Sequence, residues 1–282
     1  MLPTTDFFGT QITRMILGDN PANGNTYIPD LITREEMLEY YTVDAFADML
    51  RRGEELGYNT FLPLASPHTF AALRKFRAGG GKLNLIFQTY PQAIDRFADN
   101  VKEMLEFGPA AIYHQGSTAD YFTETDGFAT LFKNLETLRR TGLPVGMASH
   151  VPETILRAEA EGWDVDFYTA CLYNSRRTLR GQQSSFITGA SKANLKFYPE
   201  DRFEMYSVIR RVPKPFVVIK IFAGGQVFTG HDPVIYPAVA EKYIAEAYEN
   251  IKPCDVTCVG AFQRDKDQLA ENAGILKRVL RA

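Results

Sequence analysis

The chain has 282 residues, of which 45% are hydrophobic and 23% charged, with a net charge of −3. Acidic and basic residues are interspersed, which argues against a surface for nucleic acid or for an anionic membrane. The length suffices for one large hydrophobic core, so we expect a single domain spanning residues 1–282.

Several features indicate a cytoplasmic protein. No apolar run approaches the roughly 20 residues that cross a bilayer, and the opening "MLPTTDFFGTQ" lacks the pattern of a secretory signal. The three cysteines (Cys171, Cys254 and Cys258) form neither a disulfide framework nor a zinc-binding pattern. We expect a small-molecule substrate as the partner, while the oligomeric state cannot be predicted.

Short apolar runs alternate with amphipathic stretches along the whole chain. In chain order the predicted strands are Arg14–Gly18, Asn59–Leu64, Leu83–Tyr90, Ala110–His114, Pro144–Ser149, Val165–Tyr173, Pro215–Gly225 and Asp255–Gly260. The predicted helices between and after them are Thr42–Gly57, Pro67–Gly81, Pro91–Gly108, Gly127–Gly142, Pro152–Gly162, Pro199–Arg211, Pro233–Ile251 and Lys266–Ala282. Thr42 is suited to cap the first helix and Gly57 to end it.

Eight strand–helix pairs favour a closed (β/α)8 TIM barrel. Strands buried on both faces read as continuous apolar runs, and crossover helices force parallel pairing. A doubly wound open sheet is less compatible because no G-x-G-x-x-G motif follows any predicted strand. The connections after strands 1 and 6, residues 19–41 and 174–198, are unusually long. The second is basic, and it is either a lid over the substrate or a solvated loop.

All four histidines follow predicted strands, where a barrel places its active site. His231 lies in the turn "TGHDP" and is expected to be peripheral. His68, His114 and His150 follow strands 2, 4 and 5, so we expect them to converge and to be able to hold a divalent metal ion. In "AAIYH", alternation from Ala110 predicts that His114 points into the barrel. Taken alone, His114 is equally compatible with a core histidine.

Other polar residues at strand ends complete the expected site. We expect His114, Lys220 and Gln88 to be catalytic. Lys220, inside "VVIKIFAGG", is expected to face the lumen, where burial would lower its pKa for general-base or Schiff-base chemistry. The alternative is an ion pair with Asp19 or another carboxylate. Residues at or after strand ends that are expected to bind substrate are Asn20, Ser149, Asn174 and Arg176.

Several segments resemble the aldo/keto reductase family. "FGTQITRMILGDN" is similar to the N-terminal hairpin and first strand of that family, "LPVGMASHVPETILRA" to its fifth strand, and "VGAFQRDKDQLAENAGIL" to its eighth strand and following helix. "AIYHQGSTAD" resembles the fourth strand, which implies that His114 corresponds to the catalytic histidine. In the fifth strand, Ser149 corresponds to the serine of a Ser-Asn pair.

The reductase chemistry of that family needs an Asp, Tyr, Lys and His tetrad, of which only the histidine matches. "FLPLASPHTF" has neither the carboxylate nor the tyrosine, Gln88 or Thr89 stands at the lysine position, and Lys220 stands where an aromatic ring would stack on the nicotinamide. A cation there would repel the oxidised cofactor. The fold is therefore expected to carry over without the reductase mechanism.

The function we expect is a non-redox barrel enzyme that hydrolyses, eliminates or isomerises a small polar, sugar-like substrate, with a divalent metal ion or by acid–base catalysis with histidine. The first alternative is a divergent NADP-dependent oxidoreductase in which Arg264, Lys266 and Asn272 bind the cofactor at a helix start. The second is a catalytically inactive barrel that acts as a binding subunit.

Overall fold

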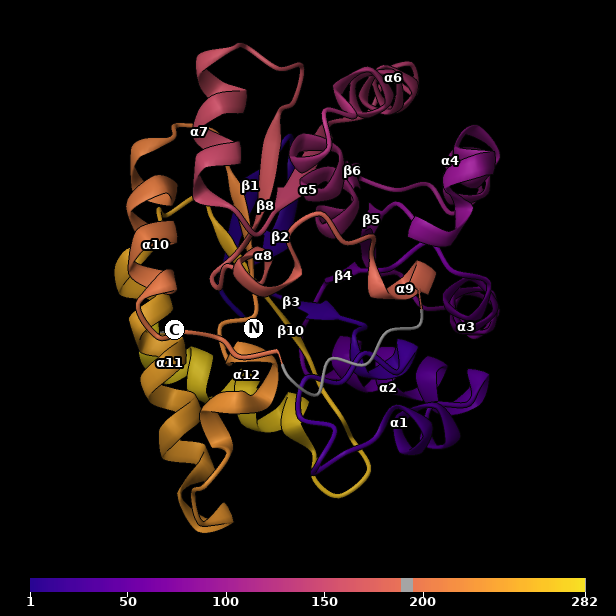
Figure 1. Cartoon of the computed structure of the whole chain (residues 1–282). Helices are drawn as coiled ribbons and strands as arrows, with labels where there is room; N and C mark the ends of the chain where they lie inside the picture. Colours follow the sequence, from indigo (N-terminus) through magenta and orange to yellow (C-terminus); the bar gives the residue numbers. More distant parts are fainter. Residues whose placement is uncertain (189–194, 282) are drawn as a thin grey trace.

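Eight parallel strands close into a barrel in the order β10-β3-β4-β5-β6-β7-β8-β9, which confirms the predicted fold (Figure 1). The computed structural model describes residues 1–188 and 195–281. The barrel strands are β3 (Met15–Gly18), β4 (Thr60–Leu62), β5 (Asn84–Gln88), β6 (Ala111–His114), β7 (Val145–Ser149), β8 (Phe167–Cys171), β9 (Phe216–Ile219) and β10 (Val256–Gly260).

Most of the helices surround the barrel on the outside (Figure 1). The helices of the described residues are α1 (Arg34–Tyr40), α2 (Val43–Glu55), α3 (Pro67–Ala78), α4 (Phe97–Leu105), α5 (Gly116–Glu124), α6 (Phe128–Arg139), α7 (Pro152–Ala160), α8 (Arg176–Leu179), α9 (Ser185–Thr188), α10 (Asp201–Arg211), α11 (Tyr236–Asn250) and α12 (Gln268–Val279). Short 3-10 turns are η1 (Pro21–Asn23), η2 (Pro91–Arg96), η3 (Ala223–Phe228) and η4 (Pro233–Ile235).

The ends of α2 follow the sequence signals. The side chain of Thr42 accepts a hydrogen bond from the backbone N–H of Ala45 at 3.2 Å. Gly57 has a φ of +97°, a backbone conformation that favours glycine and reverses the chain after the helix. In contrast, α5 lies between β6 and α6 and was not predicted.

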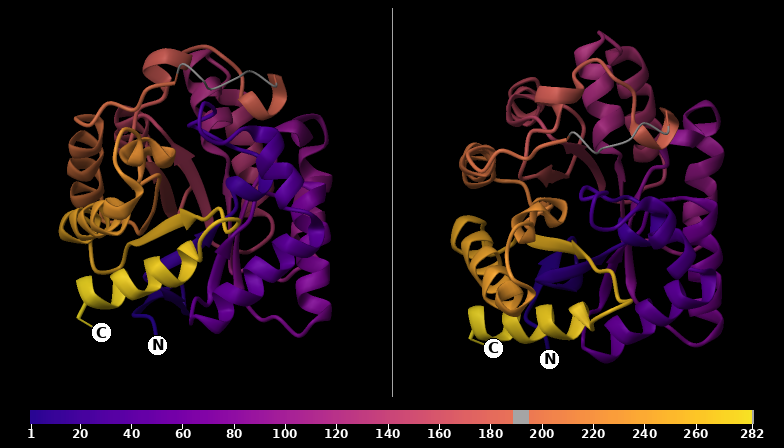
Figure 2. Two further views of the ribbon diagram at one scale, coloured as in Figure 1. Left: turned by 90° about the horizontal axis from the view of Figure 1, so that it is seen from below. Right: turned by 60° about the horizontal axis from the view of Figure 1, so that its bottom comes forward.

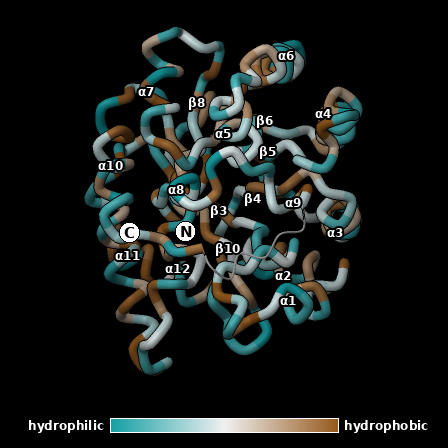
Figure 3. Tube along the Cα trace, viewed as in Figure 1, coloured by the Kyte–Doolittle hydropathy of each residue, from teal (hydrophilic) through white to brown (hydrophobic). Residues whose placement is uncertain are grey.

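The apolar core has two layers. Residues inside the barrel form one cluster, and residues between the strands and helices form a larger one. Phe7 and Ile12, from the antiparallel hairpin β1 (Thr4–Phe7) and β2 (Thr10–Thr13), pack with the inner cluster and close one end of the barrel. Figure 3 shows apolar stretches along the strands and hydrophilic stretches on the outer helices.

The side chains of β6 alternate between the cluster inside the barrel and the cluster under the helices. Ala111 and Tyr113 belong to the inner cluster, whereas Ile112 packs in the outer one. Gly146 on the neighbouring strand β7 leaves the space that the ring of Phe167 occupies, since a Cβ at Gly146 would lie 2.5 Å from that ring. The interior is therefore filled by large rings next to small residues.

The two long connections are present as predicted. The first contains η1 and α1, and the second contains α8 and α9. Figure 2 shows α8 and α9 at the end of the barrel opposite the two termini. Among the described residues, no helix combines the length and the apolar character needed to cross a membrane.

Candidate active site at the barrel mouth

A cavity of about 500 Å³ lies at the carboxyl ends of the strands. That size is common for pockets that bind small molecules. Its wall contains Asp19 after β3, Gln88 at the end of β5, His150 after β7 and Lys220 after β9. Three of the sequence-predicted residues, Gln88, His150 and Lys220, therefore share one cavity.

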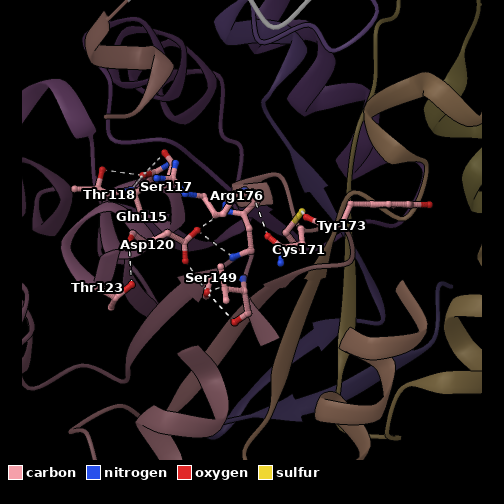
Figure 4. A network of polar contacts seen from close by, with 12 residues as sticks. Gln115, Ser117, Thr118, Asp120, Thr123, Ser149, Cys171, Tyr173 and Arg176 are labelled. Atoms are coloured by element: carbon pink, nitrogen blue, oxygen red, sulfur yellow. Dashed lines mark hydrogen bonds and ion pairs between the residues drawn. The ribbon is translucent and has the colours of Figure 1, made fainter. Parts of the chain in front are cut away.

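His150 and Lys220 in the cavity wall belong to a chain of three polar side chains, and the third, Asp120, is buried behind them. His150 Nδ1 lies 2.7 Å from Oδ2 of Asp120, and His150 Nε2 lies 3.3 Å from Nζ of Lys220. Asp120 comes from α5 and is completely buried. Its other oxygen, Oδ1, accepts a hydrogen bond of 2.6 Å from the hydroxyl of Ser149 (Figure 4). Asp120 also accepts the backbone N–H of His150 at 3.1 Å.

These contacts define the state of His150. Burial and the charge of Lys220 lower its pKa, and the opposing effect of Asp120 does not restore the ordinary value. The imidazole is therefore neutral at pH 7. Because Asp120 can only accept from Nδ1–H, the lone pair is on Nε2, on the side of Lys220. This lone pair accepts from the ammonium group of Lys220 at 3.3 Å, so it can take a proton from a substrate once that ammonium group has turned to a substrate oxygen.

Lys220 carries a positive charge in this site. Burial lowers its pKa, but the negative charges that Cys171, Tyr27 and Asp120 can carry raise it, and the net direction is above the ordinary value. Its Nζ lies 4.9 Å from the ring centroid of Tyr27. The expected lowering of this pKa was wrong, since these groups outweigh burial, so Lys220 is an ammonium group and not a Schiff-base nucleophile.

The backbone of Lys220 is in the left-handed region, with a φ of +61°. Such a conformation costs a non-glycine residue about 1 kcal/mol and persists where surrounding structure enforces it. Here it occurs directly after β9, at the residue whose side chain reaches His150. The strain therefore accompanies the placement of the ammonium group in the cavity.

Arg176 lines the cavity beside this group and is held by a buried ion pair. Its Nε lies 2.9 Å from Oε1 of Glu124, and its side chain is 3% exposed. The backbone N–H of Gly181 donates to the same carboxylate at 2.6 Å. Glu124 thus fixes the start of the long loop after β8 against α5. Figure 4 shows Arg176 next to Asp120 and Ser149.

Two predicted substrate-binding residues have different positions. Asn20 lines the cavity, and its Oδ1 accepts a hydrogen bond of 2.8 Å from Asn25. Asn174 is not part of the cavity wall. Its Oδ1 accepts the backbone N–H of Arg176 at 3.1 Å, and its own N–H donates to Asp201. Asn174 is a loop-positioning residue.

His114 does not point into the barrel, so that prediction was wrong. Its ring lies in the helix layer, 5.8 Å from the ring of Phe97 and 6.2 Å from that of Phe122. Its Nε2 lies 3.2 Å from the amide nitrogen of Asn134, and burial lowers its pKa to about 4. The inward position of β6 is taken by Tyr113, one residue earlier. His114 is a neutral core histidine.

His68 is also outside the cavity wall, so the three expected metal ligands do not converge. It lies in the first turn of α3, 5.6 Å from the ring of Phe46, and its Nε2 is buried with no hydrogen-bond partner in the described part of the chain. Within residues 1–188 and 195–281, no group of three His, Cys, Asp or Glu side chains is arranged to hold a metal ion. Only His150 of the trio reaches the site.

The residues expected to bind a dinucleotide are only partly in the cavity. Lys266 and Asn272 line its far part, next to the start of α12. Lys266 is paired with Glu271. Arg264 is on the surface, where it pairs with Asp265 and with Glu36.

Three inward residues were missed by reasoning from the sequence: Asp120, Tyr113 and, as a site residue, Asp19. Asp120 occupies the second turn of a helix that the pattern did not reveal. A signal was present, because "QGSTAD" begins with Gln115, whose side chain caps α5 by accepting from the N–H of Thr118 at 2.8 Å. Asp19 directly follows β3 in the same way that His150 follows β7.

Solved structures with a similar fold are barrels at very low sequence identity. Gox0644 in its apo form is 11% identical with a TM-score of 0.58, over 100% of this chain and 93% of that one. An aldo/keto reductase from Brucella melitensis is 11% identical with a TM-score of 0.53, over 98% and 93%. A xylose isomerase-like TIM barrel protein from Mycobacterium smegmatis, in complex with magnesium, is 14% identical with a TM-score of 0.49, over 94% and 95%.

The two likenesses with TM-scores of 0.58 and 0.53 support the fold and no particular activity. No protein-family profile matches the chain, and no curated protein matches its sequence. The aldo/keto reductase resemblance therefore holds at the level of the barrel.

Proposed function

We propose that this protein is a barrel enzyme that removes a proton next to the carbonyl group of a small polyhydroxylated substrate, by acid–base chemistry. The observation that carries the proposal is the Asp120–His150–Lys220 chain, with contacts of 2.7 Å and 3.3 Å. His150 and Lys220 line the cavity and Asp120 is buried behind them, so an oriented base and a cation lie side by side in the wall.

The two groups have complementary roles in such a step. Nε2 of His150 takes the proton from the carbon next to the carbonyl, and the electron pair of the C–H bond forms a C=C bond. The carbonyl oxygen then carries negative charge, which the ammonium group of Lys220 stabilises. Asp120 holds the imidazole and stabilises the imidazolium that forms, as a buried carboxylate does behind a catalytic histidine.

The polar part of the cavity wall is suited to a hydroxylated ligand. Side chains that can donate or accept hydrogen bonds occur in a wall that is otherwise mainly apolar; these are Asn20, Gln88, Gln115, Ser117 and Ser149. Arg176 adds a second cation. Ketoses combine a carbonyl group, an acidic α-proton and several hydroxyl groups, so we take them as the substrate class.

The direct test is exchange of the α-proton with solvent. D-Fructose, D-tagatose, L-sorbose and D-xylulose are incubated with the protein in D₂O, and loss of the proton signals next to the carbonyl is followed by NMR. We expect the wild-type protein to catalyse exchange with at least one ketose. Lys220→Met is expected to lower the rate by about 100-fold, within the range of general acid–base and oxyanion contributions.

Lys214→Met is the matched control. Lys214 precedes β9 at the opposite end of the strand and pairs with Glu159 at 2.6 Å. This variant should exchange at the wild-type rate. Absence of exchange with all four ketoses, or equal rates for the two lysine variants, would contradict the proposal.

A second candidate, NADP-dependent oxidoreduction, is favoured by one observation: the cavity extends to Lys266 and Asn272 beside the start of α12. Against it, Glu271 lines the same region and is paired with Lys266, so a phosphate there would meet a carboxylate. Titration of NADPH fluorescence decides between the two. Binding in the micromolar range would support the oxidoreductase.

A further inference from the structure

We propose that Asp19 is the general acid of this cavity, and that the reaction is elimination of water from a ketose, with the base and the acid on opposite faces of the substrate. This inference rests on the proposed function, because it assumes that His150 removes the α-proton. It adds a second catalytic residue and selects elimination over isomerisation.

The strand order places Asp19 across the barrel from His150. In the closed ring β10-β3-β4-β5-β6-β7-β8-β9, β3 and β7 are four positions apart, which is halfway around eight strands. Asp19 directly follows β3 and His150 directly follows β7. Both line the cavity. An eight-stranded barrel is wide enough at its mouth for one small ligand between such walls.

Lys220 lies between these two residues along the ring. It follows β9, which is two positions from β7 in one direction and two positions from β3 in the other. A substrate whose α-carbon lies between His150 and Asp19 therefore has Lys220 to one side. Its α-proton can face His150 and its β-hydroxyl group can face Asp19 on the opposite side, while the carbonyl oxygen projects sideways toward Lys220.

Asp19 is built to retain a proton while it faces the cavity. It is 5% exposed, and its Oδ2 accepts the backbone N–H of Leu64 at 2.6 Å. Burial raises its pKa to about 7, and the hydrogen bond from Leu64 offsets this only in part. The titratable groups that face it are Tyr113 and Cys258, whose own pKa values are raised by burial, so both are neutral near pH 7.

The elimination balances without any further reactant. His150 removes the α-proton, and the electron pair moves into a C=C bond while the carbonyl oxygen becomes an oxyanion at Lys220. The carbonyl then re-forms, the double bond shifts to the α and β carbons, and the β C–O bond breaks. The hydroxide leaves as water with the proton of Asp19. The resulting enol tautomerises to a 1,2-dicarbonyl compound, and proton exchange with solvent restores Asp19 and His150.

The test separates proton removal from elimination in the same ketose incubations. Trapping with o-phenylenediamine measures the dicarbonyl product, and α-proton exchange is followed by NMR. Asp19→Asn keeps an oxygen that can accept from Leu64 but carries no acidic proton. We expect the ratio of dicarbonyl formation to α-proton exchange in this variant to fall at least 100-fold below the wild-type ratio.

A measurement on the unmodified protein covers the case in which Asp19→Asn does not fold by circular dichroism. Wild-type dicarbonyl formation should fall as the pH rises above about 7, where Asp19 loses its proton. Exchange should not fall in that range.

Three results would overturn the inference. They are an Asp19→Asn variant that forms dicarbonyl at the wild-type rate, wild-type exchange that yields only isomerised ketose, and dicarbonyl formation that stays constant above pH 7. Each leaves the proposed function intact. Absence of any wild-type exchange would instead refute the proposed function itself.

Discussion

Two histidines at the ends of neighbouring strands lie in different environments, one in the cavity and one in the core. His150 follows β7 and contacts Asp120 and Lys220 in the cavity, whereas His114 ends β6 and packs against Phe97. Both are largely buried and both have lowered pKa values. The difference is the second partner. For His150 it is the ammonium group of Lys220 on the cavity wall, and for His114 it is the amide of Asn134 in the core.

The pKa of His114 makes the stability of the fold depend on pH. The folded value of about 4 lies below the ordinary value of 6.5, so the unfolded chain binds a proton between these values and the folded chain does not. Stability from His114 is complete above pH 6.5 and is lost as the pH falls toward 4. The loss amounts to about 3 kcal/mol.

Replacing His114 by glutamine should remove this dependence. We predict that His114→Gln loses about 3 kcal/mol less free energy of unfolding than wild type between pH 7 and pH 4. Urea denaturation at pH 7, 5.5 and 4 measures it. Parallel curves for the two proteins would show that His114 does not titrate as a buried neutral group.

Asp120, which contacts His150, is expected to determine the pH below which exchange activity is lost. Asp120 raises the pKa of His150 against burial and Lys220. Asp120→Asn should therefore move the pH at which exchange activity appears to a lower value and reduce the plateau rate by at least tenfold, because the imidazole is no longer oriented. A profile of exchange rate against pH from 4 to 8 measures both effects. An unshifted acid limb would contradict this role.

At the scale of elements, α5 connects His150 to the long loop after β8. Asp120 and Glu124 lie one helical turn apart, one contacting His150 and the other Arg176. Gly116, at the start of the helix, allows its close approach to β7, since a Cβ there would lie 3.2 Å from Ala148 and 3.3 Å from His150. A shift of α5 would move both contacts together.

The ion pair from α5 should restrain the long loop. Glu124→Gln leaves the Arg176 guanidinium buried without its counter-charge, which destabilises such sites by about 3–5 kcal/mol. It also weakens the contact that holds Gly181. We predict faster tryptic cleavage after Arg180, which is exposed and adjacent to Gly181. Glu136→Gln, at an exposed ion pair with Arg140, is the control; equal cleavage rates would contradict the restraint.

At the scale of the whole molecule, the alternation of apolar runs and amphipathic stretches was enough to predict the barrel, its eight strands and both long connections. It also placed Gln88, His150 and Lys220 at strand ends. Which residues of β6 face the barrel interior could not be predicted. All four are buried, so the sequence shows no alternation of apolar and polar residues that would identify the inward side. Tyr113 and His114 were equally possible as the inward residue.

The Asp120–His150 contact could not be predicted from the sequence for a different reason. It depends on α5, a short helix inserted between β6 and α6, which brings a residue of one strand–helix unit to the end of the next strand. His68 illustrates the converse. Its place after a strand suggested the mouth, but it falls inside the first turn of α3 and faces Phe46.

The account is tested most directly by comparing the two histidines in one assay. Rates of ketose α-proton exchange in D₂O at pH 7 are measured for wild type, His150→Gln and His114→Gln, each confirmed as folded by circular dichroism. We predict that His150→Gln loses at least 100-fold and that His114→Gln stays within threefold of wild type. Loss of exchange in His114→Gln with full activity in His150→Gln would contradict the assignment of His150 as the base.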